Sequence, residues 1–167
     1  MTTSLLTRPA NIADAPAISA LIKQLAVDLT LHPEGHGAEL FFQSVSAQAE
    51  QQYLSDRRYV FTVMLDGEQI VAFIAMRDRT HVFHLFVAKA YQQRGLAMQL
   101  WQTVVQQTAL PSACYYTVNA AIKSVGFYER LGFRRVADEV RMHGICFVPM
   151  TLLPESLQHR QQVEQTS

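Results

Sequence analysis

The residues HLFVAKAYQQRGLA occupy positions 84–97, where an apolar alternation passes through a short polar turn into the start of a second apolar pattern. This order predicts a strand that leads directly into a helix. The first turn of a helix directs unpaired N–H groups and the positive end of its dipole toward one place, so this turn is suited to bind an anion. Gly95 lets a ligand approach the backbone closely, and Arg94 can contact a phosphate.

Two other kinds of phosphate-binding loop are not supported. The chain contains neither the dinucleotide motif G-x-G-x-x-G nor the nucleotide motif G-x-x-x-x-G-K-[ST], so nicotinamide cofactors and ATP are poor candidates. The alternative interpretation of the turn is an ordinary junction between a strand and a helix, in which the glycine serves tight packing.

The periodicity on both sides of this stretch predicts a mixed α/β layer. Asp14 offers a helix N-cap, Pro16 fits a first helical turn, and Asp66-Gly67 is typical of a tight hairpin turn. The predicted elements, in the order βααβββαβαββ, are a strand at Leu5–Arg8, helices from Asp14 to about Leu29 and at Glu39–Leu54, strands at Tyr59–Leu65, Gln69–Met76 and His81–Val87, a helix from Leu96 that Pro111 closes, a strand at Cys114–Val118, a helix at Ala121–Leu131, and strands at Arg134–Val140 and Ile145–Leu152.

Composition limits the class of protein. The chain has 167 residues, 49% of them hydrophobic and 17% charged, which is typical of one globular domain. We expect this domain over residues 1–153 and a polar tail over 154–167. Because the 14 basic and 14 acidic residues balance, a broad surface for nucleic acid or anionic membrane is not expected.

The chain shows no pattern of a secreted or membrane protein. Its longest apolar run, Ile70–Met76, is far shorter than a transmembrane helix, and no signal peptide is recognised at its start. The two cysteines, Cys114 and Cys146, lie in apolar stretches and are predicted to be small buried side chains rather than a disulfide framework. These features predict a cytoplasmic location.

Two motifs resemble those of a known family, the GCN5-related N-acetyltransferases (GNAT). The residues QQRGLA at 92–97 match the signature Q/R-x-x-G-x-G/A, with alanine in the last position. Val118-Asn119 and the residues FYERLGF at 127–133 are similar to the second cofactor segment, V-N followed by F-Y-E-x-L-G-F. The order of elements from Leu5 to Leu152 agrees. The resemblance implies a single-domain GNAT-like fold with a mixed, mostly antiparallel central sheet flanked by helices.

The resemblance also implies an activity and a cofactor site. The expected reaction is direct transfer of acetyl from acetyl-CoA (coenzyme A), the co-substrate, to an amino group, without a metal; such an acyltransferase transfers groups other than amino-acyl groups. The pyrophosphate is expected at the 92–97 turn and the pantetheine arm beside the strand that precedes this turn. Asn119, Ser124 and Tyr128, later in the chain, are expected to add further contacts with the cofactor. For Ser124 a plain helix-surface role is an equal alternative. The residues implied for cofactor binding are Leu85, Phe86, Val87, Gln92, Gln93, Arg94, Gly95, Leu96, Ala97, Asn119, Ser124 and Tyr128.

Candidate catalytic residues follow from the same resemblance. Tyr128 occupies the position of the acid that protonates the departing thiolate, although Tyr128 also fits an apolar helix stripe as a packing residue. His81, eleven residues before Gln92, is the first candidate for the base that accepts the amine proton. His84 is the second, and strand alternation places it on the opposite face from His81 unless a bulge intervenes. A backbone N–H near Phe86 or Val87 is the candidate for stabilising the oxyanion.

The Pro/Gly loop after the first helix contains three residues of types that bind metals, His32, Glu34 and His36. Their spacing is not that of a zinc site. The loop is better interpreted as a lid over the acceptor site. Glu34 and Glu39 are outside candidates for the base.

The acceptor is predicted to be a small amine or a peptide, and a homodimer is expected from the resemblance to the family. Two other functions remain as alternatives to the N-acetyltransferase. One is a non-catalytic acyl-CoA-binding or sensor domain, and the other is a structural domain that binds no ligand.

The charges are unevenly distributed along the chain. Residues 1–78 carry five basic and nine acidic groups, whereas residues 79–128 carry Arg79, Lys89, Arg94 and Lys123 and no acid. The acid-free segment contains both motifs implied for the polyanionic cofactor, as electrostatic focusing favours. The acidic excess lies in the part expected to meet the acceptor and suggests a cationic amine.

Overall fold

The computed structural model describes residues 4–108 and 115–154. Its elements are β1 (Leu6–Pro9), α1 (Ala15–Leu25), α2 (Glu39–Ser44), α3 (Ala47–Ser55), β2 (Tyr59–Asp66), β3 (Gln69–Arg77), β4 (His81–Val87), α4 (Leu96–Gln107), β5 (Tyr116–Ala120), α5 (Val125–Arg130), β6 (Arg134–Arg135), β7 (Val140–Met142) and β8 (Ile145–Leu152), with short 3-10 turns η1 (Ile12–Asp14), η2 (Ala26–Asp28), η3 (Lys89–Tyr91) and η4 (Ile122–Ser124). No helix in these two ranges is long and apolar enough to cross a membrane.

The described strands form one open sheet in the order β1-β2-β3-β4-β5-β8-β6, with β7 paired to β8. Every pairing is antiparallel except that between β4 and β5. The predicted mixed, mostly antiparallel sheet flanked by helices is therefore confirmed.

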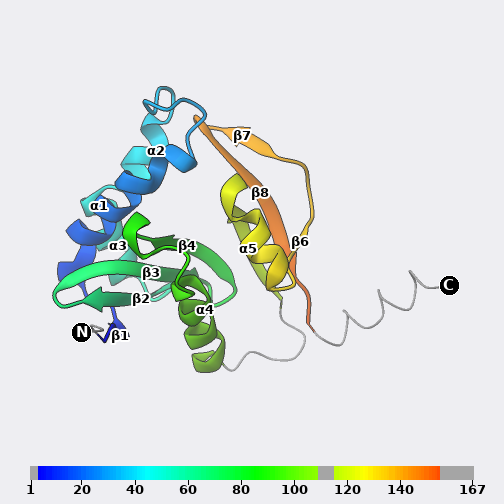
Figure 1. Ribbon diagram of the computed structural model, residues 1–167. Helices are drawn as coiled ribbons and strands as arrows, with labels where there is room; N and C mark the ends of the chain where they lie inside the picture. Colours follow the sequence, from blue (N-terminus) through cyan, green and yellow to red (C-terminus); the bar gives the residue numbers. More distant parts are fainter. Residues whose placement is uncertain (1–3, 109–114, 155–167) are drawn as a thin grey trace.

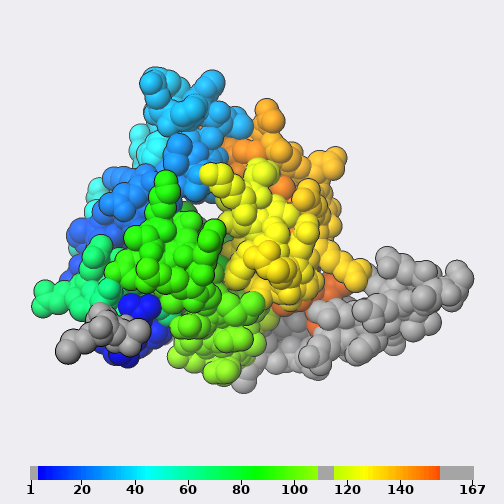
Figure 2. Space-filling model, viewed as in Figure 1, coloured from blue at the N-terminus to red at the C-terminus, as the bar shows by residue number. Residues whose placement is uncertain are grey.

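The parallel pair β4–β5 is the weak seam of the sheet. Its register contains only His81 opposite Thr117 and Val82 opposite Val118, so the two strands separate after Val82. Figure 1 shows the result: β2, β3 and β4 lie with α1 and α3 on one side, and β8, β7 and α5 lie on the other. Figure 2 shows the surface hollowed between the green atoms of β4 and α4 and the yellow atoms of α5.

Two apolar clusters cover the two faces of the sheet. One joins α4 and α5 to β4, β5 and β8, with Leu100, Trp101 and Phe133 among its largest members. The other joins α1 and α3 to β2 and β3, with Ile18, Ile22 and Phe73 at its centre. We call these the α4 face and the α1 face of the sheet.

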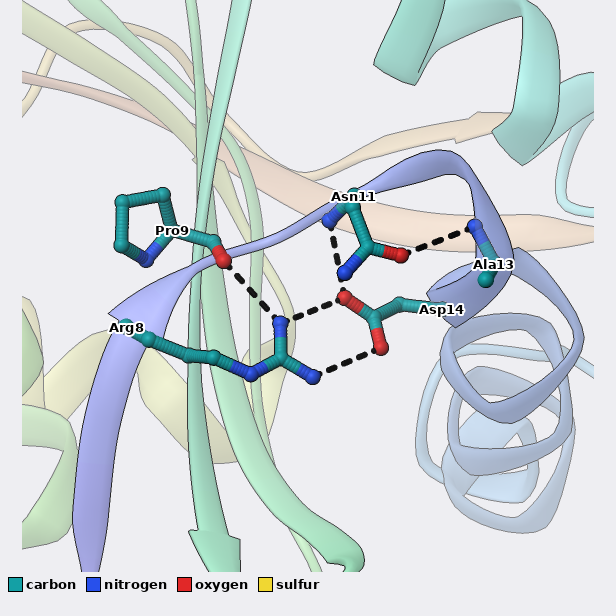
Figure 3. A network of polar contacts seen from close by, with 5 residues as sticks. All are labelled: Arg8, Pro9, Asn11, Ala13 and Asp14. Carbon is teal, nitrogen blue, oxygen red and sulfur yellow. Dashed lines mark hydrogen bonds and ion pairs between the residues drawn. The ribbon is translucent and has the colours of Figure 1, made fainter.

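The start of the first helix carries a network of capping contacts (Figure 3). Asp14 is the N-cap residue of α1 and Pro16 lies in the first turn, as predicted, although the Asp14 side chain makes no cap hydrogen bond to α1. The capping box belongs to the preceding turn η1: the Ala13 N–H donates to the Asn11 side chain, and the Asn11 N–H donates to Asp14. Arg8, at the end of β1, donates two hydrogen bonds of 2.8 and 2.9 Å to Asp14. These bonds hold the pKa of the Asp14 carboxyl below its usual range and tie the edge strand to α1.

Several boundaries differ from the prediction. The helix predicted at 39–54 is two helices, because Ser46 caps α3 by accepting from the Ala49 N–H. The hairpin turn is Gly67-Glu68 rather than Asp66-Gly67, since Asp66 pairs with Gln69 and the positive φ is at Gly67. The first helix gives way to a 3-10 turn after Leu25, the strand predicted at 134–140 is two short strands, and the helix predicted at 121–131 begins as a 3-10 turn. Cys114, Pro111 and the predicted tail beyond Pro154 lie outside the described residues.

Candidate active site

The turn between β4 and α4 has the geometry of an anion-binding loop. Gln93 and Gly95 both have positive φ, 62° and 77°, and Gly95 is the N-cap of the 12-residue helix α4. The first N–H groups of this helix have no intrahelical acceptor, and its first turn contains no acidic residue. Gln92, Gln93 and Arg94 are exposed around them. Backbone N–H groups, a helix dipole and one guanidinium thus meet at an accessible place.

Gly95 is not required for packing. A Cβ added at Gly95 would meet no described atom within 4 Å, so close contact with a neighbouring element does not explain the glycine. Its left-handed φ does favour glycine, and the open space in front of it leaves room for a ligand against the backbone. The packing interpretation of this turn is therefore the weaker one.

Arg94 is held at the loop by Tyr91. The guanidinium carbon lies 5.1 Å from the centroid of the Tyr91 ring, and the Tyr91 hydroxyl donates to Asp66 at 2.5 Å. This hydrogen bond to a carboxylate raises the pKa of the Tyr91 phenol. The β2–β3 hairpin end thereby fixes the ring on which Arg94 rests.

The edge of β4 that faces β5 offers free backbone groups beyond Val82. The Ala88 N–H donates to Val71 of β3, and antiparallel alternation then directs the N–H of Phe86 to β3 and those of Leu85 and Val87 away from it. The Val87 carbonyl on this side accepts from the Gln92 side chain at 3.0 Å. Of the two predicted oxyanion donors, only the Val87 N–H points into the gap between the strands.

Two further predicted cofactor residues lie across the gap. Asn119 is an exposed residue of β5 and pairs with Pro149 of β8. Ser124 is half-buried at the start of α5 and makes no side-chain cap bond to that helix. Leu96 is buried in the α4 face and Ala97 is half-buried, so only their backbone N–H groups are placed for an anion.

Tyr128 lies in the α4 face and is 4% exposed. Its ring makes edge contacts with Phe127 and Phe133 at 5.2 and 5.3 Å between centroids, which agrees with the packing interpretation. Its hydroxyl has no hydrogen-bond partner within the described part of the chain. Burial raises the pKa of this phenol well above its usual value, so the hydroxyl keeps its proton at physiological pH.

A bulge in β4 brings the two candidate bases to one face. Ala75 pairs with His84 but the next residue of β3, Met76, pairs with Val82, so Phe83 is the extra residue of β4. Val82 contributes to the α4 face, whereas the His84 ring lies among Phe61 and Phe73 of the α1 face. His81 and His84 therefore both point to the α1 face, and the strict alternation considered above does not hold.

The two histidines have different partners. His81 Nδ1 is 2.8 Å from Thr117 Oγ1, and burial together with the charge of Arg77 lowers the pKa of His81 to about 4. His84 Nε2 is 3.0 Å from Glu50 Oε1 of α3. Glu50 is fully buried, and no pattern in the sequence indicated it, because a glutamate on an amphipathic helix usually lies on the exposed face.

The loop between α1 and α2 meets the turn between β7 and β8 at one end of the gap (Figure 1). The Leu31 N–H donates to the Gly144 carbonyl, and the Cys146 N–H donates to the Leu29 carbonyl. Glu34 and His36 contact each other at 2.9 Å and are both largely exposed, while Glu39 is an exposed residue at the start of α2. Cys146 is half-buried, and burial and a hydrogen bond to Glu139 raise the pKa of its thiol.

Comparison with known proteins identifies the family. The model of the acetyltransferase (GNAT) domain matches residues 28–154. The chain belongs to the GNAT acetyltransferase family. Among curated proteins it is 25% identical over 135 residues to a probable N-acetyltransferase camello of Xenopus tropicalis, covering 74% of this chain and 62% of that protein. The chain thus spans less than two thirds of this relative.

Solved GNAT structures share the fold. A GCN5-related N-acetyltransferase from Rhodopseudomonas palustris superposes with a TM-score of 0.71 at 20% identity, covering 92% of this chain and 98% of that one. PaiA N-acetyltransferase from Thermoplasma acidophilum, solved in complex with coenzyme A, gives a TM-score of 0.66 at 12% identity and covers 90% and 99%. At these identities the likeness concerns the fold of a GNAT domain.

Proposed function

We propose that this GNAT domain is an acetyl-CoA-dependent N-acetyltransferase that moves the acetyl group directly from the thioester to the amino group of a small amine or a peptide. The observation that carries the proposal is the turn at 92–97, which combines unpaired helix N–H groups, an exposed Arg94 and open space at Gly95 beside two separating strands. Acetyl-CoA supplies an activated acyl group on a good leaving thiol.

The chain's own groups fit both ends of this co-substrate. The pyrophosphate matches the N–H groups of residues 93–97 and the Arg94 guanidinium, because an anion is stabilised at a helix N-terminus. The amide-containing pantetheine arm can pair as an added strand with the backbone groups of Leu85 and with the Val87 N–H, whereas the Val87 carbonyl already accepts from Gln92. The Val87 N–H is then the donor nearest to the carbonyl oxygen that becomes negative during attack.

Proton transfers are assigned to the two faces of the sheet. An alkylammonium must lose a proton before its nitrogen can attack, and an imidazole of β4 on the α1 face is suited to accept it. The thiolate that leaves needs a proton, and the unpaired Tyr128 hydroxyl on the α4 face is suited to give it. Acid and base thus approach the gap between β4 and β5 from opposite sides.

The acceptor is proposed to be a cationic amine. Asp28, Glu34 and Glu39 lie in or beside the α1–α2 loop, at the end of the gap away from the cofactor turn, and Asp28 is 2.6 Å from Lys123. Glu34 and Glu39 are exposed there and give this end a negative character that attracts an ammonium group.

The test is acceptor-dependent release of free thiol from acetyl-CoA, measured over a panel of cationic, neutral and acidic primary amines and short peptides. We expect saturable release with at least one cationic amine. Saturable binding of CoA without release by any acceptor would favour the acyl-CoA sensor instead. CoA at about 100 times its Kd should also raise the free energy of unfolding by about 2.7 kcal/mol, and the absence of any shift at high CoA would contradict both functions.

A further inference from the structure

A buried carboxylate and imidazole lie beneath the bulge of β4. The Glu50 side chain is 0% exposed and that of His84 is 8% exposed. His84 is surrounded by the rings of Phe61, Phe73 and Phe86, with centroid distances of 5.9 to 6.2 Å, and Phe83 lies at 4.1 Å. Among the described residues, Glu50 Oε2 is the only side-chain oxygen or nitrogen that has neither contact with solvent nor a hydrogen-bond partner.

This arrangement is unfavourable for stability alone. Removing a carboxylate from water costs several kcal/mol, and one hydrogen bond returns only part of that when the second oxygen stays unpaired. An apolar pair of similar volume would suit this aromatic surrounding better. Buried polar groups are normally fully hydrogen-bonded, and a pair that departs from this pattern points to a role in function.

We infer that Glu50 is a positioning residue that orients His84 as the group that takes the proton from the attacking amine, which rests on the proposed N-acetyltransferase function. A carboxylate can only accept a hydrogen bond, so the 3.0 Å contact places the ring hydrogen of His84 on Nε2. The lone pair is then on Nδ1. This atom makes no hydrogen bond to a described residue and is not among the fully buried unpartnered atoms, so it keeps contact with solvent.

The position of His84 suits this task better than that of His81. Val82 is the last residue of β4 paired with β5, and the bulge at Phe83 brings His84 to the α1 face directly beyond that point. A proton on His84 produces a cation beside a buried carboxylate. A proton on His81 produces a cation near Arg77, and its Nδ1 is already engaged by Thr117.

The charged and titratable groups around the pair come from three elements. Glu50 and Tyr53 belong to α3, and burial and the charge of Glu50 raise the pKa of the Tyr53 phenol. The ring of Tyr59 of β2 lies tilted against that of Tyr53, and Arg77 of β3 lies over the Phe83 ring. None of these side chains stands between Nε2 of His84 and Glu50, so the carboxylate is the group that sets the tautomer.

The proton balance of the step is closed. The alkylammonium gives its first proton to His84 Nδ1, which releases it to solvent; the freed lone pair then forms the C–N bond, and the nitrogen gives its second proton to His84 Nδ1. The C–S bond breaks, its electron pair leaves with the CoA sulfur, and that sulfur takes a proton from Tyr128. The imidazolium then loses its proton to solvent and the phenolate regains one, so both side chains return to their starting forms.

The first test compares Glu50→Gln with Glu50→Asp and with a control. Glu50→Gln keeps the shape and removes the charge, so kcat/KM for the best amine should fall by about 100-fold, with CoA affinity changed by less than about two-fold. Glu50→Asp should recover part of the loss. His84→Gln should lower kcat/KM by as much as Glu50→Gln does. The double variant should lower it little further, because the two residues act as one unit.

Ser19→Ala is the matched control for lost stability. The buried Ser19 hydroxyl of α1 donates to the Val45 carbonyl at 2.7 Å, next to the start of α3, and makes no contact with His84. Its removal should lower the melting temperature while kcat/KM stays within about two-fold of the wild type. A Glu50→Gln protein as active as the wild type would overturn the inference.

A second readout does not depend on turnover or on the folding of the Glu50 variants. In the wild-type protein, nitrogen NMR of the His84 ring should show a neutral imidazole with hydrogen on Nε2. Hydrogen on Nδ1 would refute the positioning role even if activity were lost on substitution. If the wild type acetylates no amine, the proposed function fails and this inference fails with it, whereas an active wild type and an indifferent Glu50→Gln variant reject the inference alone.

Discussion

A Cβ on Gly144 would lie 2.4 Å from the carbonyl carbon of Gly37. The turn between β7 and β8 therefore touches the α1–α2 loop backbone to backbone, and the 2.8 Å hydrogen bond from Leu31 N–H to the Gly144 carbonyl adds to the contact. These two segments come from opposite halves of the separated sheet. Their contact joins the halves at the end of the gap where we place the acceptor.

Gly144→Ala should destabilise the protein more than a strained φ alone explains. Gly144 has a φ of 73°. Backbone atoms of Gly37 and Ala38 occupy the place of the new methyl group, and they cannot move away as the end of a flexible side chain could. We expect a loss of about 2–3 kcal/mol in the free energy of unfolding in urea. Gly67→Ala is the matched control, because Gly67 has a φ of 59° and open space around it, and should cost about 1 kcal/mol. Equal losses would contradict the close contact.

Arg94→Gln should weaken CoA binding without affecting the fold. The Arg94 side chain is exposed and rests on Tyr91, so its removal leaves the core intact. Losing one charge-assisted contact to phosphate should raise the Kd for CoA by about 10-fold, measured by calorimetry. A pantetheine thioester without phosphate groups should bind both proteins equally. A comparable loss with that ligand would show that Arg94 acts elsewhere.

The features of the fold that sequence could predict are those set by local patterns. The apolar alternation of β2 to β4, the turn glycine at Gly67 and the start of α4 at Leu96 are visible in the sequence. The N-cap position of Asp14 follows from the local pattern as well, whereas the capping box of Asn11 with Asp14 in the turn before α1 was not predicted.

The site divides in the same way. The anion loop follows from neighbouring residues, so a short motif predicts it. The orientation of His84 depends on a bulge, and the bulge depends on the register of β4 against β3, which no local pattern in His81–Val87 reveals. Glu50 is separated from His84 by 34 residues, and only the packing of α3 on the sheet brings them together.

His81 should make stability depend on pH between about 6.5 and 4. Its pKa is about 4 in the folded protein and near 6.5 when unfolded, so in this window the unfolded chain binds a proton that the folded protein does not. The contribution of His81 to the free energy of unfolding is therefore fully present above pH 6.5 and is lost as the pH falls toward 4. Urea unfolding of the wild type and His81→Gln at a series of pH values tests this: the variant should lose less stability on acidification. Parallel curves for the two proteins would rule out the shifted pKa.

Tyr128→Phe should separate binding from turnover. The hydroxyl has no partner among the described residues, so its removal should leave stability unchanged or slightly higher and leave CoA affinity unchanged. If the hydroxyl protonates the departing thiolate, kcat should fall by about 100-fold in a thiol-release assay at saturating amine.

The leaving group provides the control for Tyr128. A thioester of a more acidic thiol expels its sulfur without help from an acid, so the deficit of Tyr128→Phe should shrink with such a donor, whereas a packing defect would persist with every donor. A Tyr128→Phe protein that turns over acetyl-CoA at the wild-type rate would remove the acid role and leave Tyr128 as a core residue between Phe127 and Phe133. The donor comparison thus decides between the two interpretations of one buried hydroxyl.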